Sequence, residues 1–161
     1  MRRLLFGTVT HAAALAVGFA LGVYFLPILT APPSPDAASL DAMAEGATYT
    51  AELQQDLRGH DLFHWGEGTI SLTESQIVHK GSLAPGPDYM VYLVPEFVEH
   101  EDDFLPLKDQ SRVIGPVKTF EGFVLDIPSG VDLTTYTTVL VWCEAFSEFI
   151  AAAEYRQPGA S

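Results

Sequence analysis

The chain has 161 residues, of which 8 are Lys or Arg and 21 are Asp or Glu, so its formal net charge is −13. Nucleic-acid binding depends on basic surface patches, and this composition excludes it as a function. The only cysteine is Cys143, so no disulfide forms within one chain. Covalent c-type haem attachment is excluded as well, because the chain has no Cys-x-x-Cys-His stretch.

Residues 1–30 predict one membrane-spanning helix. After Arg2 and Arg3 the stretch is apolar with a single histidine, and it exceeds the roughly 20 residues that span a bilayer core. Arg2 and Arg3 flank the helix on its N-terminal side only, and the first acidic residue is Asp36. The positive-inside rule therefore places the N-terminus in the cytoplasm. We therefore expect a single-pass protein of the inner membrane, with its C-terminal domain in the periplasm or otherwise outside the cytoplasm.

A cleaved signal peptide is the alternative for this segment. The apolar region of a signal peptide has about 7–15 residues and ends in small residues before the cleavage site. Here the apolar stretch is longer, and Pro32 and Pro33 follow the candidate cleavage site at Ala31. Both features favour an uncleaved anchor.

The rest of the chain predicts a tether and one domain. Residues 31–46 are rich in Pro and Ala, which is typical of a linker, and part of it suits a short helix capped by Ser34. Residues 47–155 are enough for one domain with a modest core. Residues 156–161 are expected to form a tail.

The domain shows the pattern of short strands separated by Gly, Pro and Asp, which predicts an all-β, sandwich-like fold of antiparallel strands. The expected strands are 48–53, 68–73, 75–83, 89–94, 123–127, 136–146 and 147–155. The last segment could also be helical, since its alanines suit either state. The acidic stretch 95–119 has weak periodicity and is interpreted as an insertion or long loop over the sandwich.

Cys143 lies in a strand that is apolar on both faces. Alternation places it on one face with Val139 and Val141, and places Trp142 on the other face with Leu140. A free cysteine in such a strand is often a small buried hydrophobe. It can also be a redox thiol, or a soft ligand for a metal or haem. The residues alone leave both interpretations open.

Two other stretches carry groups that bind metals. His60 and His64 lie four residues apart, which suits a metal site on a helix, but the flanking glycines favour a turn with a structural histidine. The acidic run 98–104 could hold calcium, but its spacing fits no EF-hand and a charge run of this kind is usually a solvated loop. Common motifs of hydrolases, nucleotide-binding proteins and metalloproteases are missing, which leaves open whether the chain is an enzyme.

Three stretches together resemble one family. Residues 60–72 contain a His-x-Gly-x-Gly motif, residues 86–93 read Gly-Pro-Asp-x-x-Val-Tyr-Leu, and residues 123–146 contain Ile-Pro followed by Tyr and Trp-Cys. In order and spacing they resemble the DM-thirteen domain, which is described as an electron-transfer domain. The resemblance covers about residues 47–155, with 95–119 departing from the compact versions of the domain.

The resemblance implies a sandwich-like domain displayed outside the membrane, with a redox role. The family's cysteine corresponds to Cys143, as a naked thiol or as the ligand of a cofactor such as a haem or metal held without a covalent bond. The motif histidine corresponds to His64, the candidate co-ligand or positive neighbour of a thiolate. Trp142 and Trp65 are candidates to pack around a flat cofactor, and both suit the hydrophobic core equally well. The cofactor's identity stays open, and a redox partner protein in the cell envelope is implied.

A non-enzymatic interaction module is the alternative function. The domain would then bind a protein or a glycan at the envelope, with Cys143 buried as core and the loop from Glu96 to Arg112 as the binding surface. A Cys143–Cys143 bond between two chains is a third hypothesis. The oligomeric state is therefore left open by the sequence.

Overall fold

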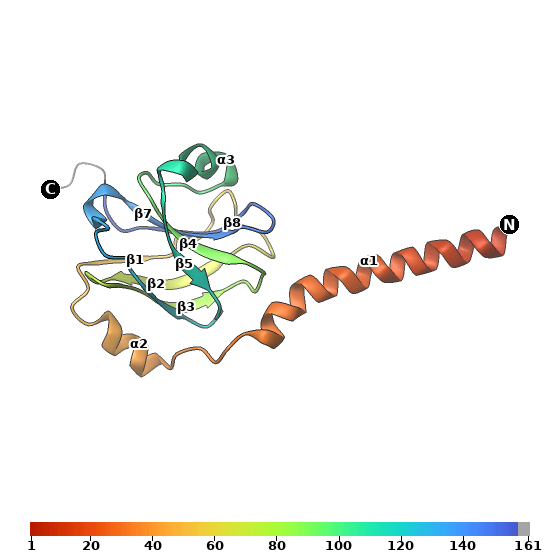
Figure 1. Cartoon of the computed structure of the whole chain (residues 1–161), viewed down its shortest axis with the longest axis horizontal. Helices are drawn as coiled ribbons and strands as arrows, with labels where there is room; N and C mark the ends of the chain where they lie inside the picture. Colours follow the sequence, from red (N-terminus) through yellow and green to blue (C-terminus); the bar gives the residue numbers. More distant parts are fainter. Residues whose placement is uncertain (158–161) are drawn as a thin grey trace.

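The structure, a computed structural model, describes residues 1–157, so residues 158–161 of the expected tail lie outside the described part. Two antiparallel four-stranded sheets pack face to face, in the orders β1-β2-β3-β6 and β5-β4-β7-β8 (Figure 1). Their strands are β1 (Tyr49–Glu52), β2 (Gly66–Leu72), β3 (Gln76–Leu83), β4 (Tyr89–Val94), β5 (Arg112–Val117), β6 (Phe123–Asp126), β7 (Thr138–Cys143) and β8 (Glu148–Glu154). The predicted all-β sandwich is confirmed.

The inner core lies between the two sheets and follows the alternation of the strands. Ile70 and Leu72 of β2 face Val139 and Val141 of β7, and Cys143 continues the same face of β7. Every side chain in this group is nearly inaccessible to solvent. The face assignment made for β7 from its sequence is thus confirmed.

A second core covers the outer face of the sheet that contains β7. Trp142 and Leu140 point to this side and pack against Phe104, whose ring centroid lies 4.8 Å from that of Trp142. Phe104 ends the short helix α3 (Glu101–Phe104), which leads into the 3-10 helix η1 (Leu105–Gln110). In Figure 1 this helical segment lies over β4 and β7. β7 is therefore buried on both faces, as its continuous apolar run indicated.

The expectation of a long loop over 95–119 was wrong in part. The segment does cover the sandwich, but it contains α3, η1 and the strand β5, which pairs with β4 at the edge of the sheet. β5 includes Gly115 and Pro116, which weaken a strand signal in the sequence. Proline is tolerated there because an edge strand has only one partner.

Two further elements differ from or refine the expectations. The ambiguous C-terminal segment is the strand β8, whose alanines are buried because both of its faces are covered. The linker contains the helix α2 (Ala37–Ala44), but Asp36 rather than Ser34 caps it. The Asp36 carboxylate accepts the Ser39 N–H at 3.0 Å, one of the donors that a helix start leaves unpaired.

The N-terminal helix α1 (Arg2–Thr30) has 29 residues and a mean hydropathy of 2.2 over its most apolar window. At 1.5 Å per residue it is about 43 Å long, more than a bilayer's hydrocarbon core of about 30 Å. Length and composition therefore suffice to cross a membrane, and a signal sequence meets the same criteria. The helix projects away from the sandwich, and its C-terminal end lies beside the domain (Figure 1).

Candidate functional site

An apolar pocket of about 360 Å³ lies where the domain meets the C-terminal part of α1. Five parts of the chain form its walls: 19–24 of α1, the turn at 63–64, the stretch 85–89, the end of β7 with the turn that follows it, and Ile150 of β8. The lining includes one imidazole, that of His64, and one thiol, that of Cys143. This volume falls within the range of small-molecule binding sites.

Cys143 lies at the base of the pocket, where β7 ends. Its side chain is 2% exposed, and its Sγ–H donates to the carbonyl oxygen of Pro87 at 3.2 Å. Burial raises the pKa of the thiol; amide hydrogen bonds from the following turn oppose this, and the charges of Asp88 and Glu148 raise it further. Cys143 is therefore a neutral thiol at neutral pH, since nothing near it stabilises a thiolate enough to offset burial.

His64 lies on the pocket wall and is oriented by Asp61. The Asp61 carboxylate accepts the backbone N–H groups of Phe63 and His64 at 2.6 and 2.8 Å, which fixes the turn. Its other oxygen lies 3.1 Å from Nδ1 of His64. Partial burial raises the pKa of Asp61, but these hydrogen bonds keep it below its ordinary value. An ionised carboxylate only accepts, so Nδ1 carries a proton and Nε2 is the ring nitrogen left for a ligand.

The stretch 85–89 forms the rim opposite His64. Gly86 has no room for a side chain, because a Cβ there would overlap the Tyr89 hydroxyl group. Asp88 adopts a left-handed conformation with φ of 55°, and its carbonyl oxygen accepts the Glu144 N–H at 3.0 Å. The Gly-Pro-Asp motif thus holds Pro87 over Cys143 and ties the rim to the end of β7.

The glycines of the His-x-Gly-x-Gly motif allow two close approaches of β2, one to the other sheet and one to its neighbour in the same sheet. Gly66 of β2 faces Ala151 of β8, and a Cβ on Gly66 would lie 2.7 Å from the Ala151 Cβ. Gly68 has φ of 106°, where a side chain is strained, and lies opposite Gly81 in β3. His64 precedes these glycines by a few residues, so the motif couples its position to the close approach of the sheets.

The structure brings together two of the four residues singled out from the sequence. Cys143 and His64 both line the pocket. Trp142 lies on the opposite face of β7 and packs in the outer core, as adjacent strand residues must. Trp65 is half-buried and is not among the lining residues. His60 packs its ring against Phe149, 5.7 Å between centroids, so it shares no site with His64.

Sequence reasoning missed the aromatic walls of the pocket. Tyr89, Phe146 and Phe63 line it, and Tyr24 of α1 lies with its ring 6.3 Å from that of Phe63. The signal that could have found them is the position of Tyr89 and Phe146 within the stretches that carry the motifs. Nothing in the sequence indicates that the end of α1 closes the site.

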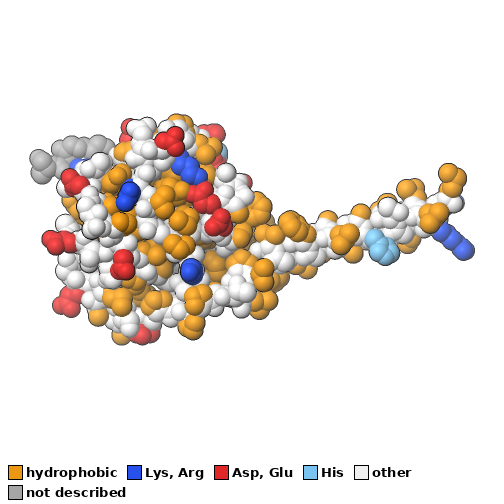
Figure 2. Space-filling model, in the orientation of Figure 1, with side chains coloured by type: hydrophobic (Ala, Val, Ile, Leu, Met, Phe, Trp, Pro, Cys, Tyr) orange, Lys and Arg blue, Asp and Glu red, His pale blue; other side chains and the backbone are white. Residues whose placement is uncertain are grey.

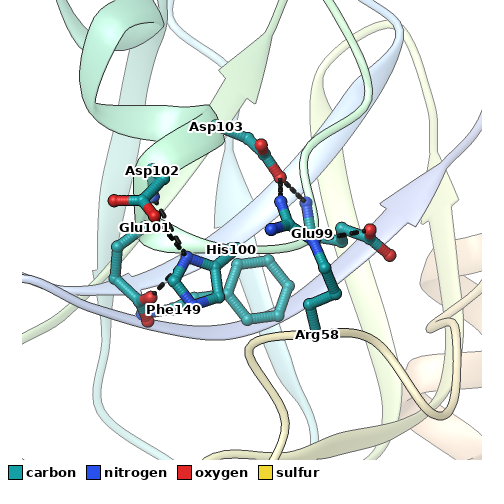
Figure 3. Close-up of polar contacts among 7 residues, drawn as sticks. All are labelled: Arg58, Glu99, His100, Glu101, Asp102, Asp103 and Phe149. Atoms are coloured by element: carbon teal, nitrogen blue, oxygen red, sulfur yellow. Dashed lines mark hydrogen bonds and ion pairs between the residues drawn. The ribbon is translucent and has the colours of Figure 1, made fainter.

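The acidic stretch 98–104 is engaged in a network of its own (Figure 3). Arg58 pairs with Glu99 at 2.9 Å and with Asp103 at 2.6 Å, and Nδ1 of His100 lies 3.0 Å from Glu101. Glu101 also accepts a backbone N–H from β8 at 3.0 Å. These contacts hold α3 on the sheet, and they use the carboxylates that were considered for calcium.

Within residues 1–157, no group of three or more His, Cys, Asp or Glu side chains is placed to hold a metal ion. The pocket offers two donors, Cys143 and His64, which is fewer than the three or four protein ligands of a typical zinc site. A haem iron takes only one or two axial ligands from the protein. Nε2 of His64 fits that role better than the Cys143 sulfur, which is protonated and hydrogen-bonded to Pro87.

Comparisons with known proteins give one match. A family model described as Electron transfer DM13 matches residues 45–155, which is more than half of the chain and includes all eight strands. No curated protein and no solved structure matches the chain.

Proposed function

Since the chain belongs to the Electron transfer DM13 family, as its motifs predicted, we propose that it is a membrane-anchored electron-transfer domain with its redox site in the pocket at Cys143. The observation that carries the proposal is the convergence of three motifs on one cavity. The first supplies His64, the second Gly86 and Tyr89, and the third Cys143. Stretches that lie far apart in the sequence thus line a single pocket.

The proposed chemistry follows from the protonation of these side chains. Cys143 contacts the bound redox group as a neutral S–H, because burial holds its pKa above the ordinary value. His64 moves the proton that accompanies an electron, through Nε2, while Asp61 keeps the proton on Nδ1. A haem, if bound without a covalent link, would take Nε2 of His64 as its ligand in place of this proton transfer and would supply a one-electron couple.

The proposed location places the domain outside the cytoplasm. Arg2 and Arg3 stay on the cytoplasmic side, α1 crosses the inner membrane once, and the sandwich lies in the periplasm or an equivalent space. Past Arg3, 6 basic residues remain of the 8 in the chain, against 21 acidic ones. We expect the redox partner protein in the envelope to present a basic surface to this acidic domain.

The alternative of an interaction module is less well supported. It needs the stretch from Glu96 to Arg112 as an open binding loop. In the structure this stretch carries Val98 and Phe104 into the outer core, where both are almost fully buried. These apolar side chains thus pack inside the domain and are not exposed to a binding partner.

Electron uptake by the purified full-length protein tests the proposal. The protein in detergent would be titrated with a reductant while its absorption spectrum, metal content and haem content are recorded. We expect a redox-active signal that Cys143→Ser and His64→Gln each abolish or shift. His60→Gln is the matched control, because His60 lies four residues away against Phe149 and outside the pocket. The proposal would be refuted if the wild-type protein took up no electrons. It would also be refuted if Cys143→Ser and His64→Gln took up electrons in the same way as the wild type.

A further inference from the structure

With α1 spanning the membrane as proposed above, the pocket lies at the level where this helix leaves the bilayer. If the hydrocarbon core begins after Arg3, about 20 residues of helix bring the chain to its outer boundary near Val23. The part of α1 that lines the pocket is the turn and a half from Phe19 to Tyr24. One wall of the pocket is therefore the outer end of the membrane span itself.

Exposed apolar side chains surround this wall. Leu62, Phe63 and Phe146 are 81%, 56% and 53% exposed, and exposed apolar side chains that gather in one place mark contact sites for proteins or membranes. Phe63 and Phe146 line the pocket directly. Figure 2 shows hydrophobic side chains gathered where α1 meets the domain. Phe and Leu are among the side chains that interfacial helices bury at the bilayer surface, and Tyr24, of a type enriched at that level, lies beside Phe63, so this rim suits contact with the bilayer.

The charges near the pocket exclude anionic ligands. The charges of Asp88 and Glu148 are felt at Cys143, where both raise the pKa of the thiol. Within the described part of the chain, no Asp, Glu, Lys or Arg lines the pocket itself, so a charged group inside it would be desolvated without a partner. Five aromatic rings contribute to the lining, which favours a flat molecule.

We propose that the pocket takes an uncharged, lipid-soluble ring compound that reaches Cys143 from the bilayer rather than from water. This inference rests on the proposed function, since it names the class of molecule on which the redox site acts. The ring lies among the aromatic side chains, and its polar atom meets Nε2 of His64. The opening beside Phe63 and Phe146 faces the lipid, so water-soluble anions are kept out.

Chemical labelling tests the direction of access, because Cys143 is the only thiol in the chain. Full-length protein in liposomes would react with an uncharged pyrene maleimide or with a sulfonated maleimide of similar ring size. In both cases the S–H adds across the maleimide double bond, so sulfur bonds to one carbon, the proton goes to the other, and nothing leaves. The raised pKa slows both reactions alike, so their ratio reports access.

The reference is a thiol placed away from the membrane, Val113→Cys on the exposed edge strand β5, in the Cys143→Ser background. Relative to it, we expect Cys143 to favour the uncharged reagent by a factor on the order of ten or more, because a sulfonate must be desolvated to enter. Phe146→Ser and Phe63→Ser should reduce this preference, whereas Leu105→Ser, exposed on η1, should not.

The inference would be overturned if Cys143 and the reference thiol showed the same preference for the uncharged reagent. It would also be overturned if neither reagent reached Cys143 in the folded protein. Labelling needs no electron transfer, so its outcome is separate from that of the redox titration. Bilayer-directed labelling without electron uptake would leave the access route in place and refute only the proposed function. Electron uptake combined with labelling from water would support the proposed function and refute the access route from the bilayer.

Discussion

Replacing Gly66 by alanine tests whether the motif glycine is required by the packing of the two sheets. The added Cβ would lie 2.7 Å from the Ala151 Cβ and 2.8 Å from a Leu83 methyl group. Carbon atoms in contact prefer about 3.5–4.0 Å, so β2 and β8 must separate to relieve the contact with Ala151, and Leu83 must shift as well. Overpacking of this kind lowers the free energy of unfolding by about 1–3 kcal/mol. For a domain of this size the melting temperature should fall by roughly 4–12 °C.

Thermal unfolding of the full-length protein in detergent, followed by near-ultraviolet circular dichroism, would measure this change. Gly115→Ala is the matched control, because its Cβ would meet only a Leu125 methyl group at 3.5 Å, an ordinary contact. The double variant Gly66→Ala, Ala151→Gly removes the closest clash. It should be more stable than the sum of the two single changes predicts, by about 1 kcal/mol.

Equal melting temperatures for Gly66→Ala and Gly115→Ala would refute the packing argument. A double variant with purely additive losses would show that Ala151 is not the residue against which the new methyl group presses. Either result would mean that the close approach of β2 and β8 does not require the first glycine of the motif.

Three further predictions concern polar groups. Burial lowers the pKa of His79, so near pH 6.5 the unfolded chain binds a proton that the folded chain does not bind. The free energy of unfolding should therefore fall as the pH drops below 6.5. His79→Gln should reduce the slope of the urea midpoint against pH. Lys108→Met removes the 2.6 Å pair with Glu144, which is partly exposed, and should lower the free energy of urea unfolding by about 0.5–1 kcal/mol. Asp61→Asn keeps the turn but frees the His64 tautomer, so electron uptake should slow while the melting temperature hardly changes.

Each of these predictions has its own contrary result. Urea midpoints of His79→Gln that follow the wild-type pH profile would show that another group titrates. Lys118→Met, a second lysine change outside the pair, should leave the unfolding free energy almost unaltered, and an equal loss would point to a general charge effect. A loss of thermal stability in Asp61→Asn as large as its loss of electron uptake would assign that carboxylate to the fold alone.

The parts of the fold that follow local rules were predictable. Alternation assigned Val141 and Cys143 to one face and Trp142 to the other, and both assignments hold because side-chain direction on a strand depends only on sequence position. The motifs gave His64 and Cys143 as site residues, and the pocket contains both.

What depends on distant partners was not predictable. The acidic stretch packs on the sheet with the help of Arg58, which lies 41 residues before Glu99 and pairs with Glu99 and Asp103. β5 forms because β4 offers a free edge, although its own glycine and proline argue against a strand. The aromatic walls depend on where the end of α1 lies, and no local pattern around Tyr24 encodes that position.

The place of the lone cysteine limits the chemistry open to it. β7 has β4 on one side and β8 on the other, and both of its faces are covered, so a second chain cannot approach Cys143 sideways. A disulfide needs Cα atoms within about 7 Å of each other, which this burial prevents for two folded domains. Only the end of the strand is open, through the pocket beside Phe146 and α1. A small molecule can pass there and a protein cannot, so the single thiol is suited to a ligand rather than to a covalent partner.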